Sequence, residues 1–312
     1  MPINRRHFIK QSATVAAGIS FLPNSISSLF QQPAMEISLA QWSLHKALFA
    51  KTLDNLDFPA KAKNDFGISV VEYVNQFFKD KARDTTYLNE LRKRCNDNGV
   101  TNHLIMIDGE GYLGDTNAKQ RMKAVENHYK WVDAAKYLGC VTIRVNAHGE
   151  GTAEEVKKAA ADGLSTLGAY GKKLGINVIV ENHGGYSSNG QWLADLMKTI
   201  NQKNIGTLPD FGNFCLKKDK DNNCLEEYDR YLGTLQMLPY AKGVSAKTYN
   251  FDETGNCKET DYKKMLQVLK GAAFSGYIGI EYEGDEISED EGIRKTKELL
   301  VKTAAEVGYT LK

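Results

Sequence analysis

The feature that most constrains the fold of this 312-residue chain is an alternation of short apolar runs with amphipathic stretches, repeated eight times after residue 35. The apolar runs are rich in Ile and Val and are bounded by Gly, Asn or Asp, which is typical of buried parallel strands. The predicted strands cover residues 36–42, 69–73, 101–107, 142–146, 177–181, 205–210, 243–247 and 277–281. Several follow a glycine that is suited to ending the preceding helix, such as Gly139 and Gly175.

The stretches between these runs carry apolar residues at the helical period, which predicts helices over residues 118–138, 153–174 and 293–307. Thr260 and Asp261 are expected to begin a seventh helix, and the eighth is expected to run to the C-terminus. Eight strand–helix units in about 280 residues predict a single-domain (β/α)8 TIM barrel, for which about 250 residues is typical. A doubly wound open sheet is the alternative, but the first strand is followed by Gln41 to His45, which contains no phosphate-binding glycine turn.

The first 33 residues are predicted to be an export signal, which leaves residues 34–312 for the barrel. Arg5, Arg6 and Lys10 precede a modestly apolar stretch from Ala13 to Leu22, and this layout resembles a bacterial twin-arginine signal. An N-terminal helix of the barrel domain is the alternative. The signal predicts a periplasmic protein.

The charge of the chain is nearly balanced, with 40 basic and 39 acidic residues. A nucleic-acid-binding protein needs an excess of positive charge for phosphate contacts, so this class is excluded. No apolar run reaches the length of about 18 residues that a membrane span needs.

The five cysteines form no C-x-x-C pair, so a structural zinc site is not expected. Free thiols on separate elements are the expectation. A single disulfide among Cys215, Cys224 and Cys257 is the open alternative, because these three lie in loop-like sequence and the periplasm permits disulfides.

Acidic residues stand at the ends of three predicted strands, namely Glu181, Asp210 and Glu281. A TIM barrel builds its active site at the carboxyl ends of its strands, so these side chains are expected to converge. Two carboxylates about 4 Å apart repel by about 4 kcal/mol at an effective dielectric constant near 20. Such a cluster is stable if the acids are protonated, spread apart or bridged by a cation. The oxygen-rich set favours Mn²⁺ or Mg²⁺, with Co²⁺ and Zn²⁺ as alternatives.

Four passages of the sequence resemble the sugar isomerase/epimerase superfamily of xylose-isomerase-like barrels, which includes endonuclease-IV-like proteins. They are Leu39-Ala40-Gln41-Trp42-Ser43, Val180-Glu181-Asn182-His183-Gly184-Gly185, Leu208-Pro209-Asp210-Phe211-Gly212-Asn213 and Gly279-Ile280-Glu281-Tyr282. The resemblance implies that Glu181, Asp210 and Glu281 are metal ligands. The fourth ligand of that superfamily is a histidine, usually in a His-x-Lys setting, where this chain has Ser245-Ala246-Lys247. His183 or water can replace that ligand, or the Lys247 ammonium can supply the positive charge without a metal.

The resemblance also implies a mechanism, in which a metal holds two oxygens of a hydroxy-ketone and stabilises an enediolate. Glu181 and Glu281 are then the proton shuttles, one on each face of the substrate carbon, and Lys247 polarises the carbonyl. The residues expected to bind the sugar are Trp42, Arg144, His148, His183 and Asn213. Each also has a structural interpretation: a tryptophan usually packs in a core, and a buried arginine usually pairs with an acid.

The predicted function is therefore the isomerisation or epimerisation of an unphosphorylated sugar or keto-sugar. A keto-glycoside lyase or dehydratase that uses the same enolisation is one alternative, and a non-catalytic sugar-binding barrel is another. A phosphodiesterase of the endonuclease-IV type is disfavoured, since the chain has only six histidines and no basic excess. His103 lies early in the third predicted strand, near the end of the barrel that serves stability, so it is interpreted as structural.

Overall fold

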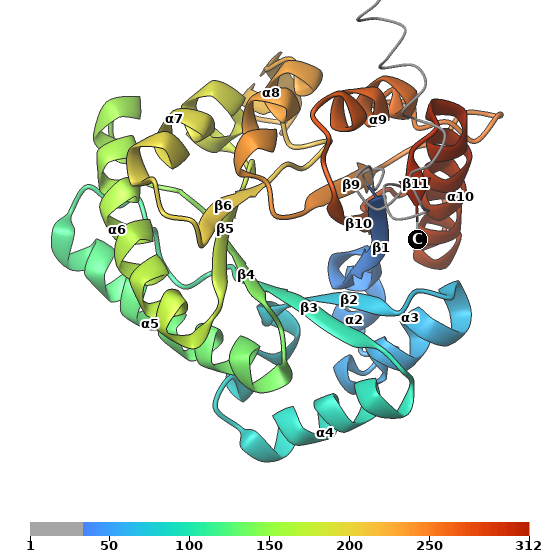
Figure 1. Ribbon diagram of the computed structural model, residues 1–312, viewed down its shortest axis with the longest axis horizontal. Helices are drawn as coiled ribbons and strands as arrows, with labels where there is room; N and C mark the ends of the chain where they lie inside the picture. The colour runs from blue at the N-terminus through green and yellow to red at the C-terminus, as the bar shows by residue number, and fades with distance from the viewer. Residues whose placement is uncertain (1–33, 312) are drawn as a thin grey trace, which may run out of the picture. The chain divides into compact units, whose positions relative to one another are not determined.

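The computed structural model describes residues 34–311. These residues form an α/β TIM barrel with helices outside a ring of parallel strands (Figure 1), which confirms the predicted fold class. The predicted export signal at residues 1–33 lies outside the described residues. Between residues 34 and 311, no helix is long and apolar enough to cross a membrane.

Eight parallel strands form the ring, and each lies within two residues of its predicted bounds. They are β1 (Ala34–Ala40), β2 (Val70–Val74), β3 (Thr101–Met106), β4 (Thr142–Val145), β5 (Asn177–Glu181), β6 (Ile205–Leu208), β9 (Val244–Thr248) and β10 (Gly276–Tyr282). Their order is β6-β5-β4-β3-β2-β1-β10-β9. The ring closes between the ends of this series, where the Phe211 amide donates to the Ser245 carbonyl (3.0 Å) and the Ser245 amide donates to the Pro209 carbonyl (2.9 Å).

The first strand ends two residues before its predicted end, because the chain turns into a short 3-10 helix over Gln41–Leu44. The Ser43 hydroxyl in this turn donates to the Ile280 carbonyl of β10 (3.1 Å). The turn carries Trp42 over the carboxyl end of the barrel.

The helices pack around the ring in chain order (Figure 1). They are the short α2 (His45–Phe49), then α3 (Phe58–Phe66), α4 (Thr85–Asp97), α5 (Ala118–Leu138), α6 (Ala153–Leu174), α7 (Gly190–Ile200), α8 (Arg230–Met237), α9 (Tyr262–Gly271) and α10 (Glu289–Val307). The sequence predicted α5 and α6 with these bounds, and Asp261 caps α9 by accepting from the Lys264 amide (3.0 Å). The prediction that the last helix reaches the C-terminus is wrong. α10 ends before Gly308, whose φ of 63° is left-handed, and the short strand β11 (Thr310–Leu311) then pairs with β1.

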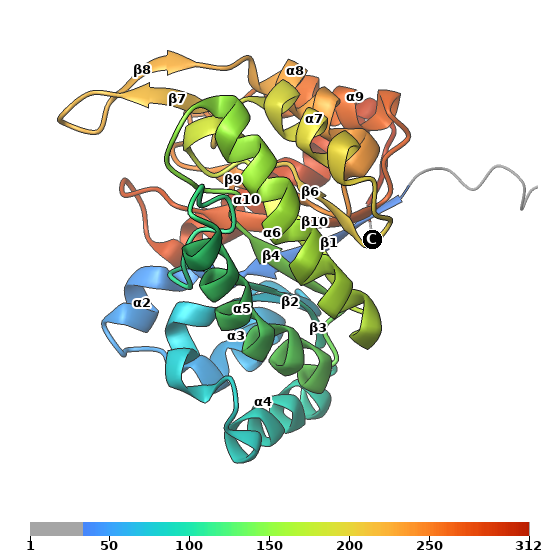
Figure 2. The same ribbon diagram turned by 90° about the vertical axis from the view of Figure 1, so that its left-hand side faces the viewer.

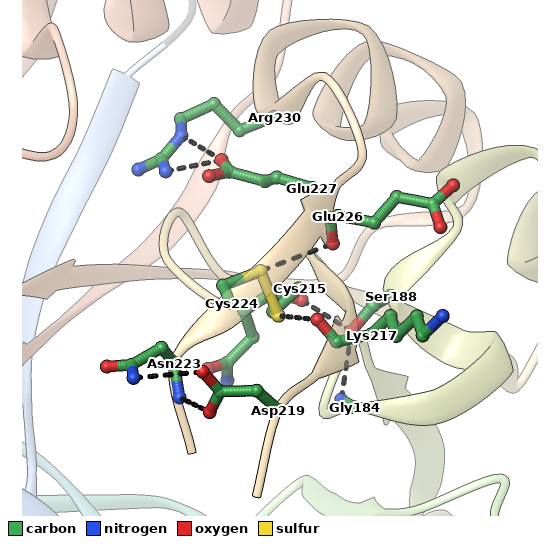
Figure 3. Close-up of a disulfide and its surroundings, with 11 residues drawn as sticks. Gly184, Ser188, Cys215, Lys217, Asp219, Asn223, Cys224, Glu226, Glu227 and Arg230 are labelled. Atoms are coloured by element: carbon green, nitrogen blue, oxygen red, sulfur yellow. Dashed lines mark hydrogen bonds and ion pairs between the residues drawn. A yellow bond between two sulfur atoms is a disulfide. The ribbon is translucent and has the colours of Figure 1, made fainter. Parts of the chain in front are cut away.

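A two-stranded antiparallel hairpin, β7 (Cys215–Lys218) and β8 (Cys224–Glu227), interrupts the strand–helix pattern after β6 and projects from the barrel (Figure 2). A disulfide joins Cys215 and Cys224, whose Cα atoms lie 5.7 Å apart (Figure 3). The expectation that all the thiols are free is therefore wrong for these two residues, because the hairpin brings them within bonding distance. The three remaining cysteines are free and buried: Cys95, Cys140 and Cys257.

The barrel has two apolar layers. The larger core lies between the strands and the helices, and it includes Trp131 of α5 and Trp192 of α7. A small cluster fills the interior of the ring and comprises Ala40, Val74, Leu104, Met106, Ile179 and Leu208. His103 is buried, with its ring centroid 4.0 Å from that of Tyr277. The interior cluster forms an apolar floor beneath the polar residues at the strand ends.

Candidate active site

A cavity of about 330 Å³ opens at the carboxyl ends of the strands. The interior cluster contributes Val74 and Met106 to its wall. Six of the predicted site residues also line it: Trp42, Arg144, His148, His183, Lys247 and Glu281. The structure therefore brings together side chains from strands that are far apart along the chain.

Three buried carboxylates meet beside this cavity. Glu181 ends β5, Asp210 follows β6, and Glu281 lies in β10, one residue from its end. One oxygen of each lies within 4.8 Å of the others. Burial raises the pKa of Glu181 to about 8 despite the nearby Arg144, and burial raises the pKa of Asp210 to about 6. Both carboxyls therefore keep their protons to a higher pH than an exposed acid does.

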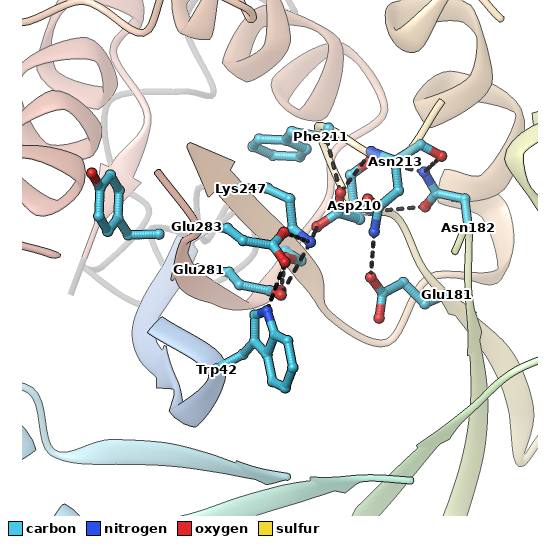
Figure 4. A network of polar contacts seen from close by, with 12 residues as sticks. Trp42, Glu181, Asn182, Asp210, Phe211, Asn213, Lys247, Glu281 and Glu283 are labelled. Atoms are coloured by element: carbon cyan, nitrogen blue, oxygen red, sulfur yellow. Dashed lines mark hydrogen bonds and ion pairs between the residues drawn. The ribbon is translucent and has the colours of Figure 1, made fainter. Parts of the chain in front are cut away.

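The Lys247 ammonium lies among these acids (Figure 4). Parallel pairing places Lys247 of β9 directly beside Glu281. Its Nζ atom is 3.1 Å from Glu281, 3.0 Å from Glu283 and 4.0 Å from Asp210. Burial disfavours the ammonium, but the three carboxylates outweigh burial and raise the pKa of Lys247 well above its usual range. Lys247 is therefore charged at neutral pH.

Arg144 balances the other side of the acidic cluster. Its Nε atom is 2.7 Å from Oε2 of Glu181, and Nη1 is 2.8 Å from Oδ1 of Asp108. Burial opposes ionisation of Asp108, but Arg144 holds the pKa of this carboxyl well below its usual range. The Asn146 amide donates to the same Asp108 oxygen (2.7 Å). The structural interpretation of Arg144 as a partner of strand-end acids is thus confirmed, although its side chain also lines the cavity.

The loop after β6 fixes Asp210. Its Oδ1 atom accepts from the amides of Gly212 (2.9 Å) and Asn213 (2.8 Å), and its backbone amide donates to Asn182 (2.7 Å). Its Oδ2 atom has no hydrogen-bond partner in the described part of the chain. The Asn213 side chain donates to Oε1 of Glu181 (2.9 Å), so it contacts the acidic cluster.

Ser245 stands where the resemblance implies a histidine ligand. Its hydroxyl donates to Oε2 of Glu281 (2.8 Å), so it positions that carboxylate. His183 lines the cavity, and its ring centroid is 6.2 Å from that of His148. Burial and the Arg144 charge lower the pKa of His183 to about 3, which keeps this ring neutral and able to accept a hydrogen bond or bind a metal.

Trp42 is held in the cavity wall by two contacts. Its indole N–H donates to Glu283 (2.7 Å), and one face stacks on His45 with ring centroids 4.9 Å apart. Glu283 and Asp108 also follow strands, and the sequence assigned them no role. Their partners come from other strands, so only the assembled ring shows that they hold Trp42, Lys247 and Arg144.

The family model for the xylose isomerase-like TIM barrel matches residues 60–303. A sequence search of curated proteins finds no match. Among solved structures, the IOLI protein with a bound zinc atom is similar at 15% identity and a TM-score of 0.67, covering 87% of this chain and 99% of its own. D-psicose 3-epimerase with D-tagatose, from Clostridium cellulolyticum H10, has 12% identity, a TM-score of 0.66 and coverages of 86% and 99%.

A third similar structure is the 3-keto-D-glucoside 4-epimerase of E. coli, at 13% identity, a TM-score of 0.61 and coverages of 86% and 99%. At these identities the structural matches show the fold alone, whereas the family model spans most of the chain. The chain belongs to the xylose isomerase-like TIM barrel family.

Proposed function

We propose that this protein isomerises or epimerises a sugar or keto-sugar through an enediolate, with a divalent metal bound by Glu181, Asp210 and Glu281. One observation carries the proposal: three buried carboxylates from separate strands present oxygens within 4.8 Å of one another beside a cavity of about 330 Å³. The similar structures include two named as epimerases of sugars or sugar derivatives, which supports the same class of reaction.

The acidic cluster fits a hard cation. Oxygen ligands lie about 2.0–2.6 Å from such an ion, so two of them can be up to about 5 Å apart. The unpartnered Oδ2 atom of Asp210 is available as a ligand. Of the alternatives for the fourth position, water is favoured, because the Ser245 hydroxyl already donates to Glu281 and, within residues 34–311, only the three acids lie close enough together to share an ion. Similar proteins include one with a bound zinc atom.

When bound, the metal supplies Lewis-acid stabilisation of the developing negative charge on the substrate oxygens. Glu281 lines the cavity and is ion-paired with Lys247, so it is suited to accept the proton from the carbon beside the carbonyl. Glu181 is the second proton shuttle, on the opposite face. The Lys247 ammonium stabilises the developing oxyanion.

The remaining cavity residues bind and orient the sugar. Trp42 offers an aromatic surface, while His148 and His183 contact its hydroxyl groups. Arg144 and Lys247 are the cations in the cavity wall, and each is already paired with carboxylates. A phosphate has no uncommitted cation in this part of the described chain, which favours an unphosphorylated substrate.

Proton exchange in D₂O tests the catalytic proposal. Candidate keto-sugars are incubated with the protein and Mn²⁺, Mg²⁺, Co²⁺ or Zn²⁺, and deuterium incorporation beside the carbonyl is followed by NMR. We expect Glu181→Gln and Glu281→Gln each to lower the rate of deuterium exchange at least 100-fold, which is the usual effect of losing a general acid or base. Glu253→Gln, an exposed carboxylate after β9, is the control and keeps full activity. Exchange that persists in both cluster variants contradicts the assignment.

Lys247 among the acids favours one other candidate, a sugar-binding barrel without a metal. Elemental analysis distinguishes the metal-dependent enzyme from the metal-free sugar-binding barrel. Metal bound in a 1:1 ratio supports the enzyme, whereas protein that binds no metal after refolding with each ion supports the lysine-based site. A lyase or dehydratase differs in its products, since β-elimination releases an unsaturated keto-sugar that NMR identifies.

We also propose that the protein is exported to the periplasm by residues 1–33. The Cys215–Cys224 disulfide supports an oxidising compartment. Cell fractionation tests this: the wild-type chain is expected in the periplasm, and replacement of Arg5 and Arg6 by lysine is expected to retain it in the cytoplasm. Periplasmic accumulation of that variant contradicts a twin-arginine route.

A further inference from the structure

A second cavity, of about 530 Å³, adjoins the first at the carboxyl end of the barrel. We call the first the inner cavity and the second the outer cavity. Tyr112 and His148 line both, with ring centroids 6.0 Å apart, so these two side chains form the border. A molecule in the inner cavity can therefore continue past the Tyr112–His148 border into the outer one.

The walls of the outer cavity combine aromatic rings with groups that accept hydrogen bonds from hydroxyls. Tyr186 stacks on Trp192, with ring centroids 5.9 Å apart, and its hydroxyl donates to the Gly151 carbonyl (2.8 Å), which fixes the ring. Glu150, Asn189 and Glu226 supply the polar atoms. No lysine or arginine lines this cavity within residues 34–311, and two carboxylates repel an anion. These walls suit a neutral, hydroxylated ring with an apolar face.

The disulfide hairpin forms one side of the outer cavity. Leu216 of β7 and Glu226 of β8 line it, and Cys215–Cys224 joins the two strands beside them (Figure 3). The hairpin has no counterpart in the repeated strand–helix units of the barrel, and it lies directly after the Asp210 loop. The outer cavity is thus an addition to the site, and it shares the Tyr112–His148 border with the inner cavity.

We infer that the outer cavity binds a second sugar ring, so that the substrate is a glycoside of at least two sugar units rather than a monosaccharide. The inference rests on the proposed function, because it takes the reacting ring to lie in the inner cavity. At about 330 Å³ the inner cavity is at the lower end of the range of about 300–1,000 Å³ for small-molecule sites, which suits a single ring. The second ring packs on Tyr186 and donates hydrogen bonds to Glu150 and Glu226.

Calorimetric titration with sugars that have no free carbonyl group tests this independently of turnover. The methyl glycosides of glucose, cellobiose and maltose, named below by their parent sugars, are titrated into the full-length protein at one fixed metal content. We expect at least one of the two disaccharides to bind 10-fold or more tightly than glucose. Tyr186→Ala is expected to remove this advantage and to change glucose affinity less than 2-fold. Tyr186→Phe keeps the ring and is the matched control, and Glu226→Gln gives a second, independent variant on the hairpin.

Disaccharide binding that is absent, or no tighter than glucose binding, overturns the inference, as does an equal loss of both affinities in Tyr186→Ala. Thermal melting of each variant verifies that it is folded. Failure of the proposed function has a different signature, because disaccharide selectivity then persists without any proton exchange in D₂O. Exchange on keto-sugars without disaccharide selectivity instead refutes only the second-ring site.

Discussion

Replacing Lys247 by methionine tests how the acidic cluster is balanced. Methionine nearly preserves the volume of the lysine stem but removes the ammonium that lies 3.1 Å from Glu281 and 4.0 Å from Asp210. We expect the metal-free Lys247→Met protein to be much less stable than the wild type at pH 7.5, and we expect a divalent metal to restore most of the loss.

The magnitude follows from the distances. Carboxylate oxygens within 4.8 Å of each other repel by at least about 3.5 kcal/mol per ionised pair at an effective dielectric constant near 20. Removing one partner of a buried ion pair costs about 3–5 kcal/mol. We expect a loss near the lower end of this range, because Glu181 and Asp210 have raised pKa values and can take up protons, which relieves part of the repulsion. A metal at 100 times its dissociation constant returns about 2.7 kcal/mol.

The assay is urea unfolding followed by circular dichroism, in EDTA and in excess Mn²⁺, Mg²⁺, Co²⁺ or Zn²⁺. Lys242→Met is the control, because Lys242 is a half-buried lysine just before β9 and no ion pair involving it is found within residues 34–311. We expect the control to lose less than 1 kcal/mol. Equal losses in the two variants, or a Lys247→Met protein as stable as the wild type in EDTA, refute the balance described above.

Three further predictions concern the rest of the barrel. Burial lowers the pKa of His103 to about 4 from an unfolded value near 6.5, so the unfolded chain binds a proton that the folded chain does not. The free energy of unfolding is therefore expected to fall by up to about 3 kcal/mol as the pH drops through this window. His103→Gln should lose this contribution in urea titrations at several pH values, and an unchanged dependence of stability on pH contradicts it. Replacing Cys215 and Cys224 together by serine opens a loop with a sequence separation of 9, which costs about 2–3 kcal/mol in the chain-entropy model, and an unchanged urea midpoint disproves this. A Cβ at Gly279 lies 2.9 Å from an oxygen of the buried Glu72, so Gly279→Ala should destabilise by about 1–3 kcal/mol in the same assay, whereas a neutral result shows that Glu72 can move.

The sequence alone indicated the barrel and the three acids of the cluster, because the signals are local. Strand and helix periods depend on neighbouring residues, and the carboxyl ends of all the parallel strands in a barrel lie at the same end of the barrel. Glu181, Asp210 and Glu281 could therefore be assigned to one site before the structure was known. The positions of the strands were correct to within two residues for the same reason.

The contacts that set the chemistry were decided only by the tertiary structure. Which acid Lys247 meets depends on the register of β9 against β10, and the pairing of Arg144 with Glu181 depends on two other strands. No sequence period encodes a register between strands. The Cys215–Cys224 hairpin likewise interrupts the strand–helix repeat from which the barrel was predicted. Its disulfide and the outer cavity beside it could therefore be identified only from the tertiary structure. Charge balance and cavity shape depend on distances between side chains that are far apart in the sequence. The sequence specifies those side chains, but only the folded chain determines the distances between them.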